Sequence, residues 1–194
     1  MTALKNQFHL SALFYRPGST VKHLVEADRG HRTALVISAF FGLMQALRFN
    51  AGSSDAFPFS RLPILSAGIL TGITGLYFFA VLVRNFSRWF GGQAELSSVR
   101  TALGLSLLPW TLLSGALLSL LVSGFDASTA VILMPVFLVL FLYGYVIVLL
   151  SVGAVLGLNA LRTTLTLAIS SVVAFFIIQL GIAIFLQLSE FLVQ

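Results

Sequence analysis

Long apolar stretches alternate with short charged segments along the whole chain. The uncharged stretches are 33–47, 62–83, 101–125, 127–161 and 163–189. A helix rises about 1.5 Å per residue, so about 20 apolar residues cross a hydrocarbon core of roughly 30 Å. The last four stretches are long enough, and the first becomes so because Arg48 can extend its charged end to the membrane surface. The pattern predicts an all-α, polytopic membrane helical bundle with five transmembrane helices, at about 33–49, 62–83, 101–123, 128–156 and 163–189.

The stretch 127–161 is long enough to raise the question of two crossings. Two crossings joined by a turn would need about 40 apolar residues. A polar segment that contains glycine, Gly157 to Ala160, lies near its end and is typical of a turn. We therefore predict one helix over 128–156, followed by a tight turn into the last span.

The segment 1–32 precedes the first span and has no apolar run long enough for a signal peptide. Two short stretches carry apolar residues at helical spacing, separated by Pro17-Gly18: Leu10, Leu13 and Phe14, then Val21, Leu24 and Val25. We predict short amphipathic N-terminal helices in a cytoplasmic segment. They would either bind anionic lipid or a cytosolic partner in the membrane interface, or cover the ends of the bundle.

Composition and charge support a membrane protein and exclude other classes. Of 194 residues, 58% are hydrophobic and 9% are charged, whereas a soluble domain carries about 25% charged residues. With a cytoplasmic N-terminus, nine of the eleven basic residues fall on the cytoplasmic side, which predicts N-in, C-out topology. Nucleic-acid binding is not expected, because the basic residues are scattered between apolar stretches. The absence of Cys excludes disulfides and cysteine catalysis.

Ionisable residues are absent from the middle of every predicted span. Such residues would be the strongest sign of ion or proton transport. The three histidines, His9, His23 and His31, lie in the N-terminal segment and lack the spacing of a metal site. Sequence motifs of hydrolases, metalloproteases and phosphate-binding loops are also missing. We predict that the protein is not an enzyme and has no catalytic residue, metal or cofactor.

Small residues and prolines within the spans are candidates for helix packing and for kinks. Gly68-x-x-x-Gly72 and Gly153-x-x-x-Gly157 would let two helices approach closely in lipid. Pro109 and Pro135 each remove a backbone hydrogen bond and tend to kink a helix. Broken helices also form substrate sites in transporters, so this alternative stays open.

The segment between the second and third spans is the most distinctive part of the sequence. Arg84 and Arg88 lie one helical turn apart and could meet lipid phosphates, while Trp89 suits the membrane interface. Gly91 and Gly92 permit a chain reversal. The predicted interaction loop comprises Arg84, Arg88, Trp89, Gly91, Gly92, Glu95 and Arg100. The alternative is an interfacial turn without a further role.

This loop resembles that of the Yip1 family, especially its small bacterial members. In that family a Gly-Gly turn precedes a short amphipathic stretch and a span with a mid-helix proline, as Gly91-Gly92 and Pro109 do here. The segment from Leu13 to Glu26 is also similar to the family's approach to the first span. The resemblance implies a bacterial inner-membrane location and a membrane-organising or trafficking-type role. Eukaryotic members act in vesicle transport with Rab-type GTPases, but their Asp-Leu-Tyr-Gly-Pro-like motif is absent here.

Two functions follow from these observations. The first is a non-enzymatic scaffold or accessory subunit, with the lipid bilayer, anionic headgroups at the cytoplasmic face, and a protein partner or second copy as partners. The second is a small transporter, channel or lipid-handling protein, motivated by Pro109 and Pro135. It predicts a hydrated cavity to which Gln45, Gln179, Thr71 or Thr74 contribute. The sequence leaves open whether the loop 50–61 is functional.

Overall fold

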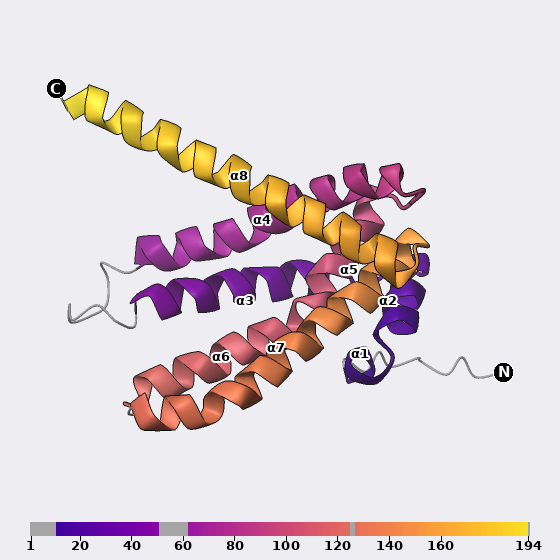
Figure 1. Cartoon of the computed structure of the whole chain (residues 1–194), viewed down its shortest axis with the longest axis horizontal. Helices are drawn as coiled ribbons and strands as arrows, with labels where there is room; N and C mark the ends of the chain where they lie inside the picture. Colours follow the sequence, from indigo (N-terminus) through magenta and orange to yellow (C-terminus); the bar gives the residue numbers. More distant parts are fainter. Residues whose placement is uncertain (1–10, 51–61, 125–126, 194) are drawn as a thin grey trace.

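The computed structural model describes residues 11–50, 62–124 and 127–193, and every regular element in these ranges is an α-helix (Figure 1). Two short helices come first, α1 (Ala12–Tyr15) and α2 (Pro17–Glu26). They are followed by α3 (His31–Asn50), α4 (Leu62–Trp89), α5 (Leu96–Ser106), α6 (Leu108–Val122), α7 (Ala127–Leu156) and α8 (Ala160–Val193). The predicted all-α fold class is confirmed. Residues 51–61, most of the loop 50–61, lie outside the described ranges.

Four helical segments are long and apolar enough to cross a membrane. They are α4, α5 together with α6 (Leu96–Val122), most of α7 (Val131–Leu156) and most of α8 (Ala160–Leu188). The first predicted span, 33–49, corresponds to α3, which is not among them. Charged and polar residues near both ends of α3, such as Arg32 and Arg48, lower its mean hydropathy. The number of five spans therefore stays a prediction.

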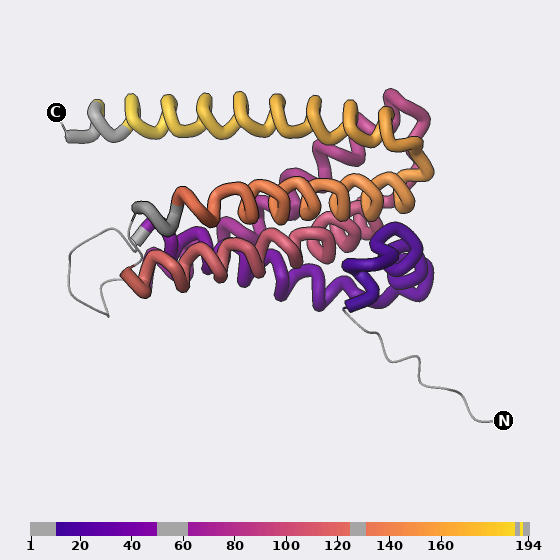
Figure 2. Tube along the Cα trace, turned by 60° about the horizontal axis from the view of Figure 1, so that its bottom comes forward, coloured from indigo at the N-terminus to yellow at the C-terminus, as the bar shows by residue number. Residues whose placement is uncertain are grey.

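Successive long helices run antiparallel, and α5 lies at the centre of the bundle (Figure 1). Helix α3 packs against α4, α5 and α6, whereas α7 packs against α2, α5, α6 and α8. The C-terminal half of α8 extends away from the other helices, as Figures 1 and 2 both show. Every residue from Phe175 to Leu188 is accordingly exposed. Hydrocarbon chains of a bilayer would cover this apolar surface.

The most tightly packed part of the core surrounds α5. All residues of α5 from Thr101 to Ser106 are buried. A β-carbon on Gly104 would lie only 2.7 Å from that of Ala34, so α5 and α3 are in close backbone contact. Leu13 of α1 and Val21 of α2 are fully buried against the same core. The N-terminal helices thus cover this end of the bundle.

Glycines bring α3 and α4 together along their length. A β-carbon on Gly42 would overlap the carbonyl oxygen of Gly68 and lie 2.9 Å from the Cα of Gly72. A β-carbon on Gly72 would overlap the carbonyl oxygen of Ser38. Gly68 and Gly72 therefore lie in a helix–helix contact. On the α3 side this contact is formed by three small residues, Ser38, Gly42 and Ala46.

The remaining glycines and prolines of the predicted packing and kink set have different positions. Pro109 lies in the first turn of α6, where a helix tolerates proline, and the third span is broken at Leu107 between α5 and α6. Pro135 lies inside the unbroken helix α7. Gly157 has a positive φ of 69° and ends α7, with no neighbour near its missing side chain. Gly153 faces the first turn of α8, where Thr163 Oγ1 would lie 2.9 Å from a β-carbon.

Candidate functional site

Basic side chains gather at the end of the bundle where α1, α2, the α4–α5 turn and the α7–α8 turn lie, at the right of Figure 1. We call this the basic end. Its described basic residues are Arg16, Lys22, Arg29, Arg32, Arg84, Arg88, Arg100 and Arg162. Arg48, in the last turn of α3, lies towards the opposite end. The charge asymmetry expected from the sequence is thus also a property of the folded bundle.

Two glycines shape the α4–α5 turn for different reasons. Gly91 adopts a positive φ of 90°, which residues with a side chain rarely adopt. The Gly92 N–H donates to the carbonyl oxygen of Ser87 over 2.9 Å. A β-carbon on Gly92 would lie 3.0 Å from that of Ser87. Gly91 therefore supplies a backbone conformation, and Gly92 allows the chain to pass close to the end of α4.

The side chains of the predicted interaction loop separate into two groups. Trp89 is 74% exposed and makes an edge contact with Phe86, with ring centroids 4.9 Å apart. Arg88 is exposed beside it. Arg100 instead turns towards α4, where its guanidinium carbon lies 4.4 Å from the ring centroid of Tyr77. The loop therefore does not form one continuous surface.

Arg100 and Glu95 line a polar cleft of about 750 Å³ at the basic end. Its other wall is the α2–α3 turn and the start of α3, which contribute Asp28, Arg29, Gly30, His31 and Arg32. The cleft thus combines three guanidinium groups with two carboxylates. Sequence reasoning did not join the α2–α3 turn to the interaction loop, because the two segments are far apart along the chain.

His31 lies in this cleft, before the predicted span. Burial lowers the pKa of His31, the positive charge of Arg100 lowers it further, and the carboxylate of Asp28 opposes both effects. The imidazole is therefore neutral near pH 7. The net charge of the cleft comes from its arginines and is positive, which suits an anionic group.

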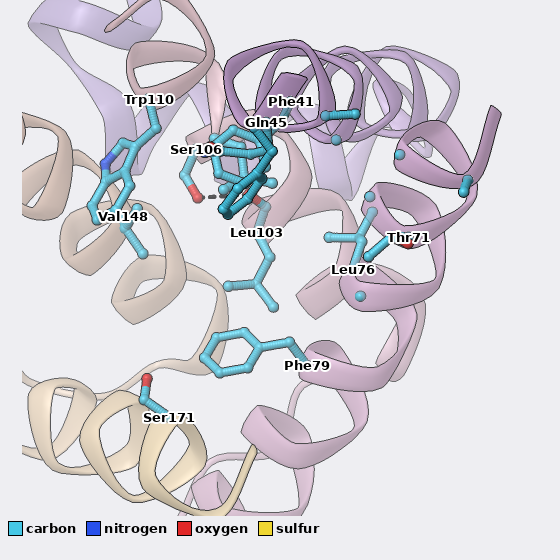
Figure 3. Close-up of a pocket in the computed structure, with 18 of the residues that line it drawn as sticks. Phe41, Gln45, Thr71, Leu76, Phe79, Leu103, Ser106, Trp110, Val148 and Ser171 are labelled. Atoms are coloured by element: carbon cyan, nitrogen blue, oxygen red, sulfur yellow. Dashed lines mark hydrogen bonds between the residues drawn. The ribbon is translucent and has the colours of Figure 1, made fainter. Parts of the chain in front are cut away.

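A second cavity, of about 630 Å³, lies within the bundle between α3, α4, α5, α6, α7 and α8 (Figure 3). Phe79, Leu103 and Val148 face its interior from three different helices (Figure 3). Its polar lining residues are Gln45, Thr71, Ser106, Trp110, Tyr145 and Ser171. Of the residues predicted for a hydrated cavity, Gln45 and Thr71 line it. Thr74 and Gln179 are not part of its lining.

Two polar side chains of the pocket wall, Gln45 and Ser106, are engaged in hydrogen bonds, whereas the buried Nε1 of Trp110 has no hydrogen-bond partner in the described part of the chain. Gln45 donates from Nε2 to the Oγ of Ser114 over 3.4 Å, and its Oε1 accepts a bond of 3.3 Å from Arg48. Ser106 donates to the carbonyl oxygen of Leu103 in its own helix. Other buried hydroxyls in the bundle bond back to their own helices in the same way, among them Ser38, Thr101, Thr166 and Ser170. These hydroxyls donate within their own helices and do not present free donors to a pathway.

Within residues 11–50, 62–124 and 127–193, no group of three or more His, Asp or Glu side chains could hold a metal ion. The comparisons with known proteins give one match. The Yip1 domain matches residues 11–183, nearly the whole chain. No curated protein and no solved structure matches the sequence. The extent of the match, together with the apolar helices, shows that this multi-pass membrane protein belongs to the Yip1 family.

Proposed function

We propose that this Yip1-family protein is a non-enzymatic scaffold or accessory subunit that binds its partner at the basic end. The observation that carries the proposal is the open cleft that Arg29, Arg32 and Arg100 line from two separate segments. Arg29 and Arg32 are exposed and are therefore accessible to a partner. A surface of this charge attracts anionic lipid headgroups and acidic protein segments.

The location of the cleft relative to the membrane supports the same role. By the positive-inside rule, the basic end faces the cytoplasm, and in a bacterium the bundle would lie in the inner membrane. The exposed Trp89 lies at the end of α4, where an amphipathic ring suits the headgroup layer. Anionic headgroups would then surround the basic end, and a protein partner or a second copy of the chain would dock from the cytoplasm.

Charge reversal in the cleft tests this role. The variant combines Arg29→Glu and Arg32→Glu, and its control combines Arg16→Glu and Arg162→Glu, which change the charge of the same end equally outside the cleft. Both proteins are purified gently from native membranes, and the bound proteins are quantified by mass spectrometry. We expect a stoichiometric protein partner with the unaltered chain and the control, and its loss from the cleft variant. An unaltered chain that purifies without any partner, or equal recovery with both variants, would contradict the proposal.

A lipid-handling role is a second candidate, favoured by the intramembrane pocket. Its lining consists mainly of apolar side chains, and Gln45 and Ser106 already have hydrogen-bond partners. This wall suits an apolar guest better than the hydrated path of a channel. Retention of a defined lipid by the purified protein would support this candidate, and a pocket that accepts no lipid would count against it.

A further inference from the structure

We propose that the intramembrane pocket holds one hydrocarbon chain of an anionic phospholipid whose phosphate is bound by Arg48. The proposal deepens the lipid-handling candidate by naming the ligand and its orientation. It does not depend on the scaffold role, because Arg48 lies towards the end of the bundle opposite the cleft.

The dimensions of the pocket fit a single chain. Along α4 its lining extends from Ile64 to Phe79, fifteen residues apart, or about 22 Å at the helical rise. When the radius of a water molecule, about 1.4 Å, is allowed for on each side, a volume of about 630 Å³ spread over this length gives a channel roughly 9 Å wide. A further helix, about 10–12 Å in diameter with its side chains, is too wide for this space. An extended hydrocarbon chain is narrow enough and long enough.

The chemistry of the wall also favours an apolar guest. Its lining is mainly apolar and includes Phe41, Leu76, Phe79, Leu103 and Val148, at the depth of the membrane-spanning helices. Because the amide of Gln45 and the hydroxyl of Ser106 are bonded within the protein, a chain that enters the pocket leaves neither of them unpaired. The buried Nε1 of Trp110 is without a hydrogen-bond partner among the described residues, but most of the wall is apolar, so water in the same space would have few places to bind.

Arg48 supplies the headgroup contact at one end of the pocket. Its neighbours Gln45 and Phe49 line the pocket, and its Nη1 donates to Gln45 over 3.3 Å. Its Nε is buried and has no hydrogen-bond partner. Among the residues that the structure describes, the one salt bridge is between Lys22 and Glu26, so no carboxylate there neutralises Arg48. A phosphate accepts strong hydrogen bonds from a guanidinium, which would compensate the positive charge of Arg48.

A pair of glycine substitutions isolates the pocket. Gly75 lines it, and no atom lies within 4 Å of the position of its missing β-carbon, so Gly75→Leu would fill the pocket without displacing a helix. Gly181→Leu is the matched control, because Gly181 is equally open but lies on the exposed part of α8 outside the pocket. Arg48→Gln removes the charge without filling the pocket.

The purified proteins are stripped of lipid, incubated with phosphatidylglycerol or phosphatidylcholine, and examined by native mass spectrometry. We expect the unaltered chain and Gly181→Leu to bind one phosphatidylglycerol, and Gly75→Leu to lose at least tenfold in affinity for both lipids. Arg48→Gln should retain chain binding but lose the preference for phosphatidylglycerol. Equal binding by Gly75→Leu and Gly181→Leu would overturn the pocket assignment, and an unchanged preference in Arg48→Gln would overturn the headgroup assignment.

A thermal melt of each variant shows that it is folded, and the co-purified proteins are measured in the same preparations. A variant that loses the lipid and keeps its protein partner separates this inference from the scaffold proposal. A chain that binds lipid as expected but purifies without a partner would contradict the scaffold proposal and leave the lipid proposal intact.

Discussion

Replacement of Gly42 by Ala tests the contact on which the position of α3 depends. The added methyl group would overlap the Gly68 carbonyl oxygen and lie 2.9 Å from the Cα of Gly72, whereas non-bonded carbon atoms prefer about 3.5–4.0 Å. The obstructing atoms belong to the backbone of α4, so no side-chain rotation can relieve the overlap. Helices α3 and α4 must move apart by about 1 Å or more, and the contacts on either side of Gly42 loosen with them.

The size of the effect follows from the cost of overpacking. Forcing extra volume into a packed interface costs about 1–3 kcal/mol, and the rigid backbone on both sides places Gly42→Ala near the upper value. For a chain of this length, about 3 kcal/mol corresponds to a fall in Tm of roughly 6–12 °C. Gly75→Ala is the control, because it makes the same substitution in a neighbouring helix at a site with open space. Its Tm should be unchanged or slightly higher, since Ala favours a helix over Gly by about 1 kcal/mol.

The assay is thermal unfolding of the two variants in the same mild detergent. A Gly42→Ala protein that melts within about 2 °C of Gly75→Ala, well inside the expected fall, would refute the reasoning. It would mean that α3 does not lie against the backbone of α4. The expected result would establish α3 as an integral part of the bundle, which supports the fifth predicted span.

Three further expectations concern other contacts. Gly144→Ala places a β-carbon 2.6 Å from Cδ1 of Trp110, so the indole must shift. We expect altered fluorescence of Trp110, measured in a Trp89→Phe background. An unchanged spectrum would contradict the close approach of α6 and α7. Tyr143→Phe removes the hydrogen bond from α7 to the carbonyl oxygen of Phe14, and we expect faster limited proteolysis near α1. An unchanged rate of proteolysis would mean that this bond does not hold α1 in place. The pKa of His31 is lower in the folded than in the unfolded chain, so the unfolded chain binds the proton more readily as the pH falls below about 6.5. The stability of the folded chain should therefore decline from pH 7 to pH 5, and His31→Gln should abolish the contribution of His31 to this decline. Equal pH dependence of the Tm in the unaltered chain and in His31→Gln would exclude this role.

The residues that carry the candidate sites were visible in the sequence to different degrees. Gln45 and Thr71 were expected to line a cavity as polar residues in apolar spans, and both line the pocket. The cleft was not foreseen as a unit, because Arg29 and Arg32 precede α3 whereas Arg100 lies on α5. Gly42 was also missed, since no second glycine marks its face of α3. The small residues Ser38 and Ala46, each four positions away, were the available signal.

Length, hydropathy and local turn chemistry determined the helical class, the membrane character and the end of α7 at Gly157. These properties depend on residues close together along the chain, because a helix satisfies its backbone hydrogen bonds within itself. Only the tertiary structure decided that α5 lies at the centre, that the α2–α3 turn meets the start of α5, and that six helices line one mainly apolar pocket. The apolar pattern shows that each helix prefers hydrocarbon to water. It does not show which helix faces which, because lipid and protein side chains are almost equally apolar and the choice rests on shape and close contact.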